Sequence, residues 1–100
     1  MNLLYFKLNS GEELIAPATK VDIGWHVVNP AILIGMPEHK IALATWLPYT
    51  TIQDGGIIPF SAIMLTLNVA EDMAEYYTKW INPNSENIIK VGSDGNVLPK

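Results

Sequence analysis

Short apolar segments, each ended by turn-forming residues, occupy the first two thirds of this 100-residue chain. Leu3–Leu8 ends at Asn-Ser-Gly, and the next segment, Leu14–Val21, ends at Asp-Ile-Gly. This punctuation is typical of β-strands joined by tight turns. Pro17 lies inside the second segment, and because proline cannot donate a hydrogen bond to a sheet, it predicts an edge strand or a bulge there.

Three further apolar segments complete the predicted sheet. "WHVVNPAILIG" is rich in β-branched residues and is interpreted as one strand bent at Asn29-Pro30. "IALATWLPY" and "IIPFSAIMLTLNV" follow it, with an Asp-Gly-Gly turn between them. About five short strands at such spacing predict a small, closed or nearly closed antiparallel β-barrel.

The hydrophobic period becomes helical after the last of these segments. One helical face collects the apolar residues Val69, Met73, Tyr76, Tyr77, Trp80 and Ile81. Asn68 and Glu71 resemble a capping arrangement at the start of this helix, and Asn82-Pro83 ends it. We therefore predict a mostly β domain with one C-terminal α-helix over residues 1–82, and a flexible or hairpin tail over residues 83–100.

The balance of apolar and charged residues predicts a subunit interface. Hydrophobic residues make up 49% of the chain and charged residues only 16%, whereas about a quarter is usual for charged residues. "IALATWL" and "SAIMLTLNV" are apolar on both faces, and a small barrel with one helix cannot cover both. Unpaired apolar edges aggregate, so we expect neighbouring subunits to cover them, through Ile41, Leu43, Thr45, Leu47, Ile63, Leu65 and Leu67.

Several functional classes are disfavoured by what the sequence contains. It has no cysteine, no apolar run of membrane length and no basic leader, which predicts a cytoplasmic protein without disulfides or a membrane partner. The two histidines, His26 and His39, have no metal-ligand spacing, and the serines have no nucleophile context. We therefore predict no metal, no cofactor and no enzymatic activity.

"LNSGEELIAPATKVD", followed by "VVNPAIL", resembles the first motif of Sm-like proteins. The matching positions are Gly11, Leu14, Ala16, Asp22 and Asn29, and "DGGIIPFSAIMLTL" resembles the second motif. The similarity spans residues 3–69 and is greatest to small Sm-like proteins of bacterial viruses. It implies a small Sm-like or SH3-like barrel of strongly bent strands. In that family the fourth strand of one subunit pairs with the fifth of the next, which implies a homo-oligomeric ring of roughly five or six subunits.

The same resemblance implies single-stranded RNA binding or an RNA-chaperone role. In that family, an aromatic or imidazole side chain in the loop that faces the pore of the oligomer stacks on a base, and an asparagine contacts the base edge. The residues that correspond to this site are Asp22, Trp25, His26, Asn29, Gly55 and Gly56.

Simpler interpretations of these residues and of the fold stay open. Trp25 also suits the start of a core strand, and Asn29-Pro30 suits a simple bend. The ring could instead be a structural or assembly module that contacts proteins without RNA, or the chain could be a monomeric SH3-like peptide-binding barrel. The net charge of −4 and the absence of arginine favour these alternatives, because arginine and positive charge are the usual means of holding phosphates.

Overall fold

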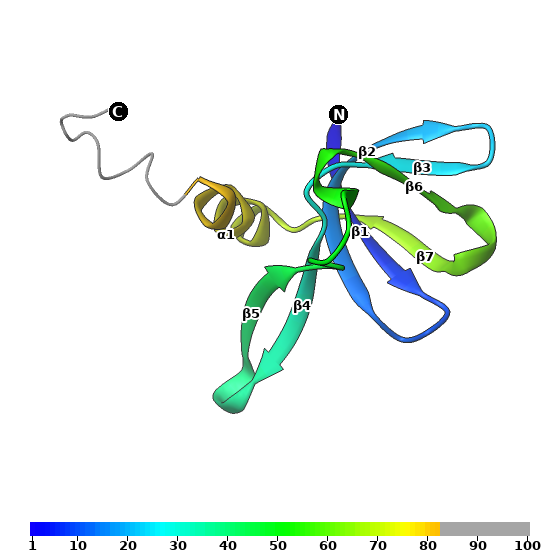
Figure 1. Cartoon of the computed structure of the whole chain (residues 1–100). Coiled ribbons are helices and arrows are strands. Elements are labelled where there is room, and N and C mark those ends of the chain that lie inside the picture. The colour runs from blue at the N-terminus through cyan, green and yellow to red at the C-terminus, as the bar shows by residue number, and fades with distance from the viewer. Residues whose placement is uncertain (83–100) are drawn as a thin grey trace, which may run out of the picture. The chain divides into compact units, whose positions relative to one another are not determined.

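The computed structural model describes residues 1–82, which divide into a unit over Met1–Val69 and a second unit that begins at Ala70. The first unit is a seven-stranded antiparallel sheet (Figure 1). Its strands are β1 (Asn2–Leu8), β2 (Glu13–Val21), β3 (Gly24–Val27), β4 (Ala31–Met36), β5 (Lys40–Thr45), β6 (Gly56–Pro59) and β7 (Ile63–Asn68). The second unit contains helix α1 (Glu71–Ile81). A mostly β chain with one C-terminal helix is therefore confirmed, and the predicted tail over residues 83–100 lies outside the described residues.

The number of strands exceeds the prediction because two apolar segments are each divided. The segment predicted as one bent strand forms β3 and β4, and the interruption falls at the expected Asn29-Pro30, where Asn29 has a φ of 45°. The segment from Ile57 to Val69 forms β6 and β7, separated by the single 3-10 turn η3 (Phe60–Ala62). β6 and β7 pair with different neighbours, β3 and β1, whereas β3 and β4 share the neighbour β2 and differ in their second one, β6 for β3 and β5 for β4.

Strand β2 is the longest strand and lies in the middle of the sheet. It pairs with β1 from Ala18 back to Glu13. On its other side, Leu14 and Ile15 pair with β4, whereas residues 18–21 pair with β3. Pro17 lies between these two pairings, where no N–H is needed for either, and its carbonyl accepts a hydrogen bond of 3.1 Å from the amide of Val28. Of the two predicted alternatives, an edge strand or a bulge, the edge strand is therefore wrong, because a change of partner accommodates the proline in a central strand.

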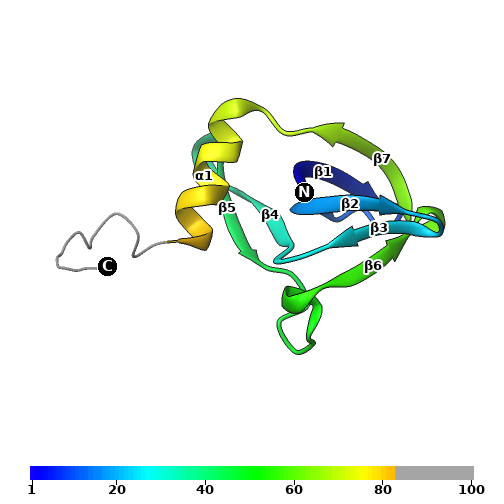
Figure 2. The same cartoon turned by 90° about the horizontal axis from the view of Figure 1, so that it is seen from above.

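The sheet remains open at its outer strands. The main pairing order is β5-β4-β2-β1-β7, and β6 is attached through β3. Strands β5, β6 and β7 therefore each have one paired neighbour within the described chain. Figure 2 shows how the strands curve round the core between these free edges.

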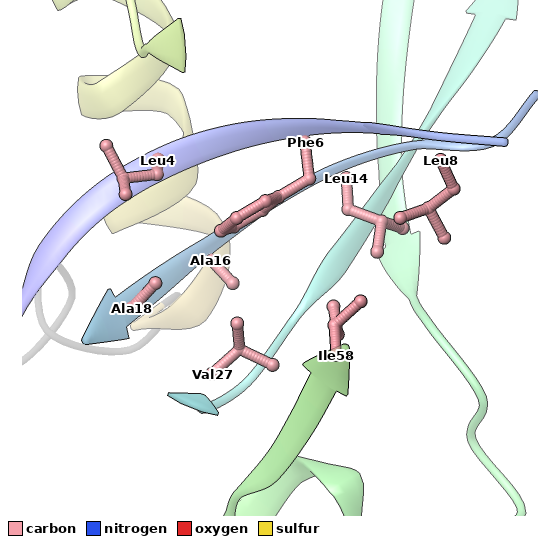
Figure 3. Packing of buried hydrophobic residues seen from close by; sticks show 8 residues of the cluster. All are labelled: Leu4, Phe6, Leu8, Leu14, Ala16, Ala18, Val27 and Ile58. Carbon is pink, nitrogen blue, oxygen red and sulfur yellow. The ribbon is translucent and has the colours of Figure 1, made fainter. Parts of the chain in front are cut away.

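One hydrophobic core lies on the concave side of the curved sheet (Figure 3). Side chains at alternate positions of β1 and β2 enter it, as the period of two in a strand requires. Its buried members are Leu4, Phe6, Leu8, Leu14, Ala16, Ala18, Val27 and Ile58. Phe6 is fully buried and meets the ring of Trp25 edge-on, with centroids 5.8 Å apart. This core holds β3 and β6 against the β1–β2 pair.

Helix α1 starts and ends close to the predicted residues. Its N-cap is Ala70, which makes no side-chain cap, so the expected capping arrangement of Asn68 with Glu71 is wrong. Two acidic residues in the first turn, Glu71 and Asp72, instead suit the positive end of the helix dipole. The helix ends at Ile81, as predicted from Asn82-Pro83. No helix within residues 1–82 has the length and apolar character needed to cross a membrane.

Gly24 offers a direct test of the contact between β3 and β6. A Cβ at this position would lie 2.1 Å from the carbonyl oxygen of Ile58 and 2.7 Å from Cα of Pro59, and backbone atoms cannot move aside cheaply. We expect Gly24→Ala to lower the free energy of unfolding by about 1–3 kcal/mol, as overpacking does. Gly35→Ala is the matched control, because nothing lies within 4 Å of its added Cβ. Urea unfolding of both variants checks this, and equal stabilities would contradict the close approach.

Tyr5 gives the fold a predicted dependence on alkaline pH. Burial, and then the hydrogen bond of 2.5 Å that its hydroxyl donates to Glu13, raise the pKa of Tyr5 to about 12. The folded state therefore favours the neutral phenol. The resulting stabilisation is complete below pH ~10, the usual pKa of tyrosine, and is lost as the pH rises towards 12.

We expect the wild-type protein to be more stable than Tyr5→Phe near pH 8, and this difference to shrink between pH 10 and 12. Tyr77, whose pKa burial also raises to about 12, is present in both proteins and cancels in the comparison. Denaturant unfolding at a series of pH values measures the difference. A difference that stays constant with pH would show that the Tyr5–Glu13 contact does not act through ionisation.

Candidate nucleic-acid interface

The structure separates the six residues predicted to contact RNA. Asp22 lies in the turn between β2 and β3, which is exposed. His26 lies near the other end of β3, and the antiparallel pairing of β3 with β6 places Gly56 opposite Val27 at that end. Asn29 follows β3 directly. Five of the six residues therefore belong to two places, one at each end of the β3–β6 pair, and the sixth, Trp25, packs against the core.

His26 and Gly55 are in close contact at the first of these places. A Cβ on Gly55 would lie 2.9 Å from Nε2 of His26, so a glycine is needed for the imidazole to lie where it does. Gly55 also has a φ of 135°, which side chains other than hydrogen rarely allow. The amide of Asn29 donates a hydrogen bond of 3.1 Å to the carbonyl of Gln53. We call His26, Asn29, Gln53, Gly55 and Gly56 the His26 cluster.

Trp25 has a structural environment. Its side chain is half-buried, contacts the ring edge of Phe6 and packs against the core cluster. Side chains alternate along β3, so Trp25 and Val27 face the core while His26 faces outward. A ring held in this way offers only part of its surface to a base. The interpretation of Trp25 as a core residue therefore agrees with its contacts better than a stacking role does.

An exposed aromatic ring that the sequence did not single out lies at the second place. Phe60 begins the turn η3, is 41% exposed and has the ammonium nitrogen of Lys20 at 5.8 Å from its ring centroid. Its amide donates a hydrogen bond of 3.1 Å to the carbonyl of Ile23, which joins η3 to the β2–β3 turn. Asp22 and Ile23, both exposed, complete this place. We call Lys20, Asp22, Ile23 and Phe60 the Phe60 platform.

The Phe60 platform combines the groups that single-stranded nucleic acids need. A flat exposed ring can stack on any base, and an adjacent ammonium can neutralise a phosphate. The carboxylate of Asp22 can accept a hydrogen bond from an exocyclic amino group of a base. The His26 cluster has an imidazole and backbone groups but no lysine, so its charge is less suited to a phosphate.

The seven residues predicted to form a subunit interface differ in exposure. Leu43 is buried, and Ile63 packs against the core of its own chain. Four apolar side chains remain between 42% and 49% exposed, namely Ile41, Leu47, Leu65 and Leu67, and Thr45 is also exposed. Residues 41–70 contain only one charged side chain, that of Asp54. The open strands β5, β6 and β7 therefore carry an exposed surface that is almost free of charge.

Comparison with protein-family models found no match, and comparison with curated proteins found none either.

Proposed function

We propose that this protein is an Sm-like subunit of a homo-oligomeric ring that binds single-stranded RNA. The observation that carries the proposal is the exposed ring of Phe60 beside Lys20, at one end of a strongly bent open sheet. RNA bases would stack on the ring, and the lysine would stay close to the backbone.

The pairing of the strands supports an Sm-like arrangement. β3 and β4 together act as one bent strand, which pairs with β2 on one side. On its other side, β3 pairs with β6 and β4 pairs with β5, so that β5 and β6 act as a second bent strand with a loop inserted. Counted in this way, the sheet has five strands, which lie side by side in the order β7, β1, β2, β3/β4 and β5/β6. Along the chain, β5/β6 is the fourth of these strands and β7 is the fifth, and they form the two opposite edges of the sheet.

Those opposite edges support assembly into a ring. The unpaired side of β5/β6 and the unpaired side of β7 can pair between neighbouring copies, and repeated head-to-tail contacts close when the rotation permits. Exposed Leu65 and Leu67 on β7, with Ile41 on β5, would supply apolar contacts. The pairing would also remove edges that otherwise favour aggregation.

The electrostatics of the chain limit how the RNA is held. A net charge of −4 on each subunit opposes a polyanion, and the chain has no arginine. Binding through stacking and base edges is therefore favoured over binding through a basic surface. We expect weak affinity, a shallow dependence on salt and a preference for single strands over duplexes, because only unstacked bases can reach an aromatic ring.

The same net charge favours one alternative function, a structural or assembly module that contacts proteins without RNA. Exposed apolar side chains at both ends of the β3–β6 pair, such as Ile23 and Ile57, would suit such contacts. The two functions share the ring and differ in whether Phe60 contacts a base.

The ring predicts a mass in solution of roughly five or six times that of the 11.1 kDa chain. Light scattering after size-exclusion chromatography measures it. Leu67→Lys should shift the protein towards monomer, because it places a charge on the apolar edge of β7. Ile23→Lys is the matched control, since Ile23 is 64% exposed but lies in the β2–β3 turn and not on an open strand. A wild-type monomer at tens of micromolar would contradict the ring and favour a monomeric SH3-like barrel.

Phe60→Ala should weaken the binding of short oligo-uridine or oligo-adenine by about 1–3 kcal/mol, or roughly 5-fold to 150-fold. Lys20→Gln should reduce the salt slope by about 0.7, as the loss of one contact to a single-strand phosphate does. Fluorescence anisotropy at two salt concentrations measures both effects.

Tyr76→Ala is the control for Phe60→Ala, because Tyr76 is also an aromatic residue with 41% exposure. His26→Ala distinguishes the Phe60 platform from the His26 cluster. If His26→Ala weakens RNA binding and Phe60→Ala does not, the RNA contacts the His26 cluster. If the wild-type protein binds no RNA at tens of micromolar, the assembly module becomes the better interpretation.

A further inference from the structure

The loop over residues 46–55, which joins β5 to β6, is firmly attached at both ends. The amide of Trp46 donates a hydrogen bond of 3.1 Å to the carbonyl of Pro30, and its indole donates one of 3.2 Å to Glu12. The Gln53 side-chain amide donates a bond of 3.0 Å to the carbonyl of Trp46, which ties the two ends together. Trp46 and Ile52 both pack against the core. The loop therefore has a defined shape.

The tip of this loop holds a strained residue. Leu47 has a φ of 51°, in the left-handed region that a leucine rarely adopts. Thr50 stabilises this turn, because its amide and its hydroxyl both donate to the carbonyl of Leu47, at 3.1 Å and 2.9 Å. Backbone strain that the surroundings maintain tends to occur at functional positions.

The strained turn presents apolar side chains to solvent. Tyr49 is 98% exposed, Leu47 is 42% exposed, and Pro48 between them is also exposed. The hydrogen bonds from Thr50 to Leu47 hold the backbone on both sides of Tyr49, so binding orders only its side chain. Tyrosine is enriched at the centre of protein interfaces. The tip therefore has the composition and rigidity of a protein contact.

The absence of charged side chains on the tip favours an uncharged surface as its partner. Residues 46–53 contain no charged side chain, so this tip has no positive charge that would neutralise a phosphate. Strand β7 is also uncharged and exposes Met64 at 63%, Leu65 at 46% and Leu67 at 49%. Copies that each carry a net charge of −4 repel one another least where both surfaces are neutral.

Position along the chain points to the same surface. The loop begins where the open strand β5 ends and leads into the open strand β6. If β5 and β6 face β7 of a neighbouring copy, as the proposed ring requires, then a loop inserted between them lies beside that β7. The contact would be continuous with the proposed strand pairing and would add a side-chain anchor to it.

We propose that the Leu47–Pro48–Tyr49 tip docks on strand β7 of a second copy of this chain, with Tyr49 as the anchor. This inference rests on the proposed ring and adds a contact to it. The contact lies outside the strand pairing and away from the Phe60 platform, so it contributes to assembly and not to RNA binding.

Photo-crosslinking of the full chain tests the position of the contact. Benzoylphenylalanine replaces Tyr49 in an unlabelled copy, which is exchanged into oligomers of ¹⁵N-labelled protein and irradiated. Mass spectrometry then identifies links between light and heavy copies. We expect them within residues 63–68, whereas the same photoreactive residue in place of Thr19, which is exposed on the central strand β2, should not link to that segment.

Tyr49→Ala tests the strength of the contact. Its side chain is almost fully exposed in one chain, so the fold should be unchanged, and the dissociation constant of the oligomer should rise at least tenfold in analytical ultracentrifugation. Tyr76→Ala should leave that constant within about twofold.

Links to other segments, or an unchanged dissociation constant, would overturn this inference and leave the ring in place. A wild-type protein that is monomeric and gives no light–heavy links would overturn the ring, and the docking of Tyr49 with it.

Discussion

The pairing of strand β2 with three neighbours is the constraint on which the rest of the sheet depends. One side of β2 pairs with β1 along most of its length, and the other side pairs first with β4 and then with β3. This division is compatible with a proline at position 17 because the change of partner occurs there. It also forces the chain between β3 and β4 to turn sharply, which Asn29 and Pro30 accomplish. The curvature of the sheet, which lets it surround the core, follows from the change of partner at Pro17 and the turn at Asn29-Pro30.

The same arrangement of β2 and its neighbours places the His26 cluster and the Phe60 platform at the two ends of the β3–β6 pair. Gly24 allows the backbones of β3 and β6 to approach closely. Their register then brings Pro59 and Phe60 to the β2–β3 turn, and brings Gly55 to the side of His26. Both candidate places therefore consist of residues distant in sequence and near in space. Glycine is required twice, once for close approach between strands and once for space beside an imidazole.

Local sequence patterns predicted most of the fold, because strands, turns and the helix are signalled by nearby residues. The helix end at Ile81 and the bend at Asn29-Pro30 are examples. Pro17 misled the prediction, since a single strand pattern cannot reveal that its neighbours change partway along. The candidate site was less predictable for the same reason. Nothing near Phe60 in the sequence indicates Lys20, and only the pairing of β3 with β6 brings them together. The sequence left two interpretations of Trp25 open, because an aromatic residue after a turn suits a binding loop and a core strand equally well, and its contacts with the core favour the second.

The distribution of charge links the open sheet to both proposals. Almost all charge in residues 1–82 lies before residue 41 or on α1, and the three open strands carry no charged side chain apart from Lys40, the first residue of β5. An uncharged edge is costly for a monomer, because nothing prevents it from pairing with another chain. Beyond Lys40 at the start of β5, these edges carry none of the lysines that usually protect an edge strand, as the proposed pairing between copies would require. Lys20, in contrast, has its ammonium over the exposed ring of Phe60, where a positive charge would serve the proposed phosphate contact and not strand pairing. The proposed assembly and the proposed RNA binding would thus place opposite demands on charge, and the chain would meet them on separate surfaces.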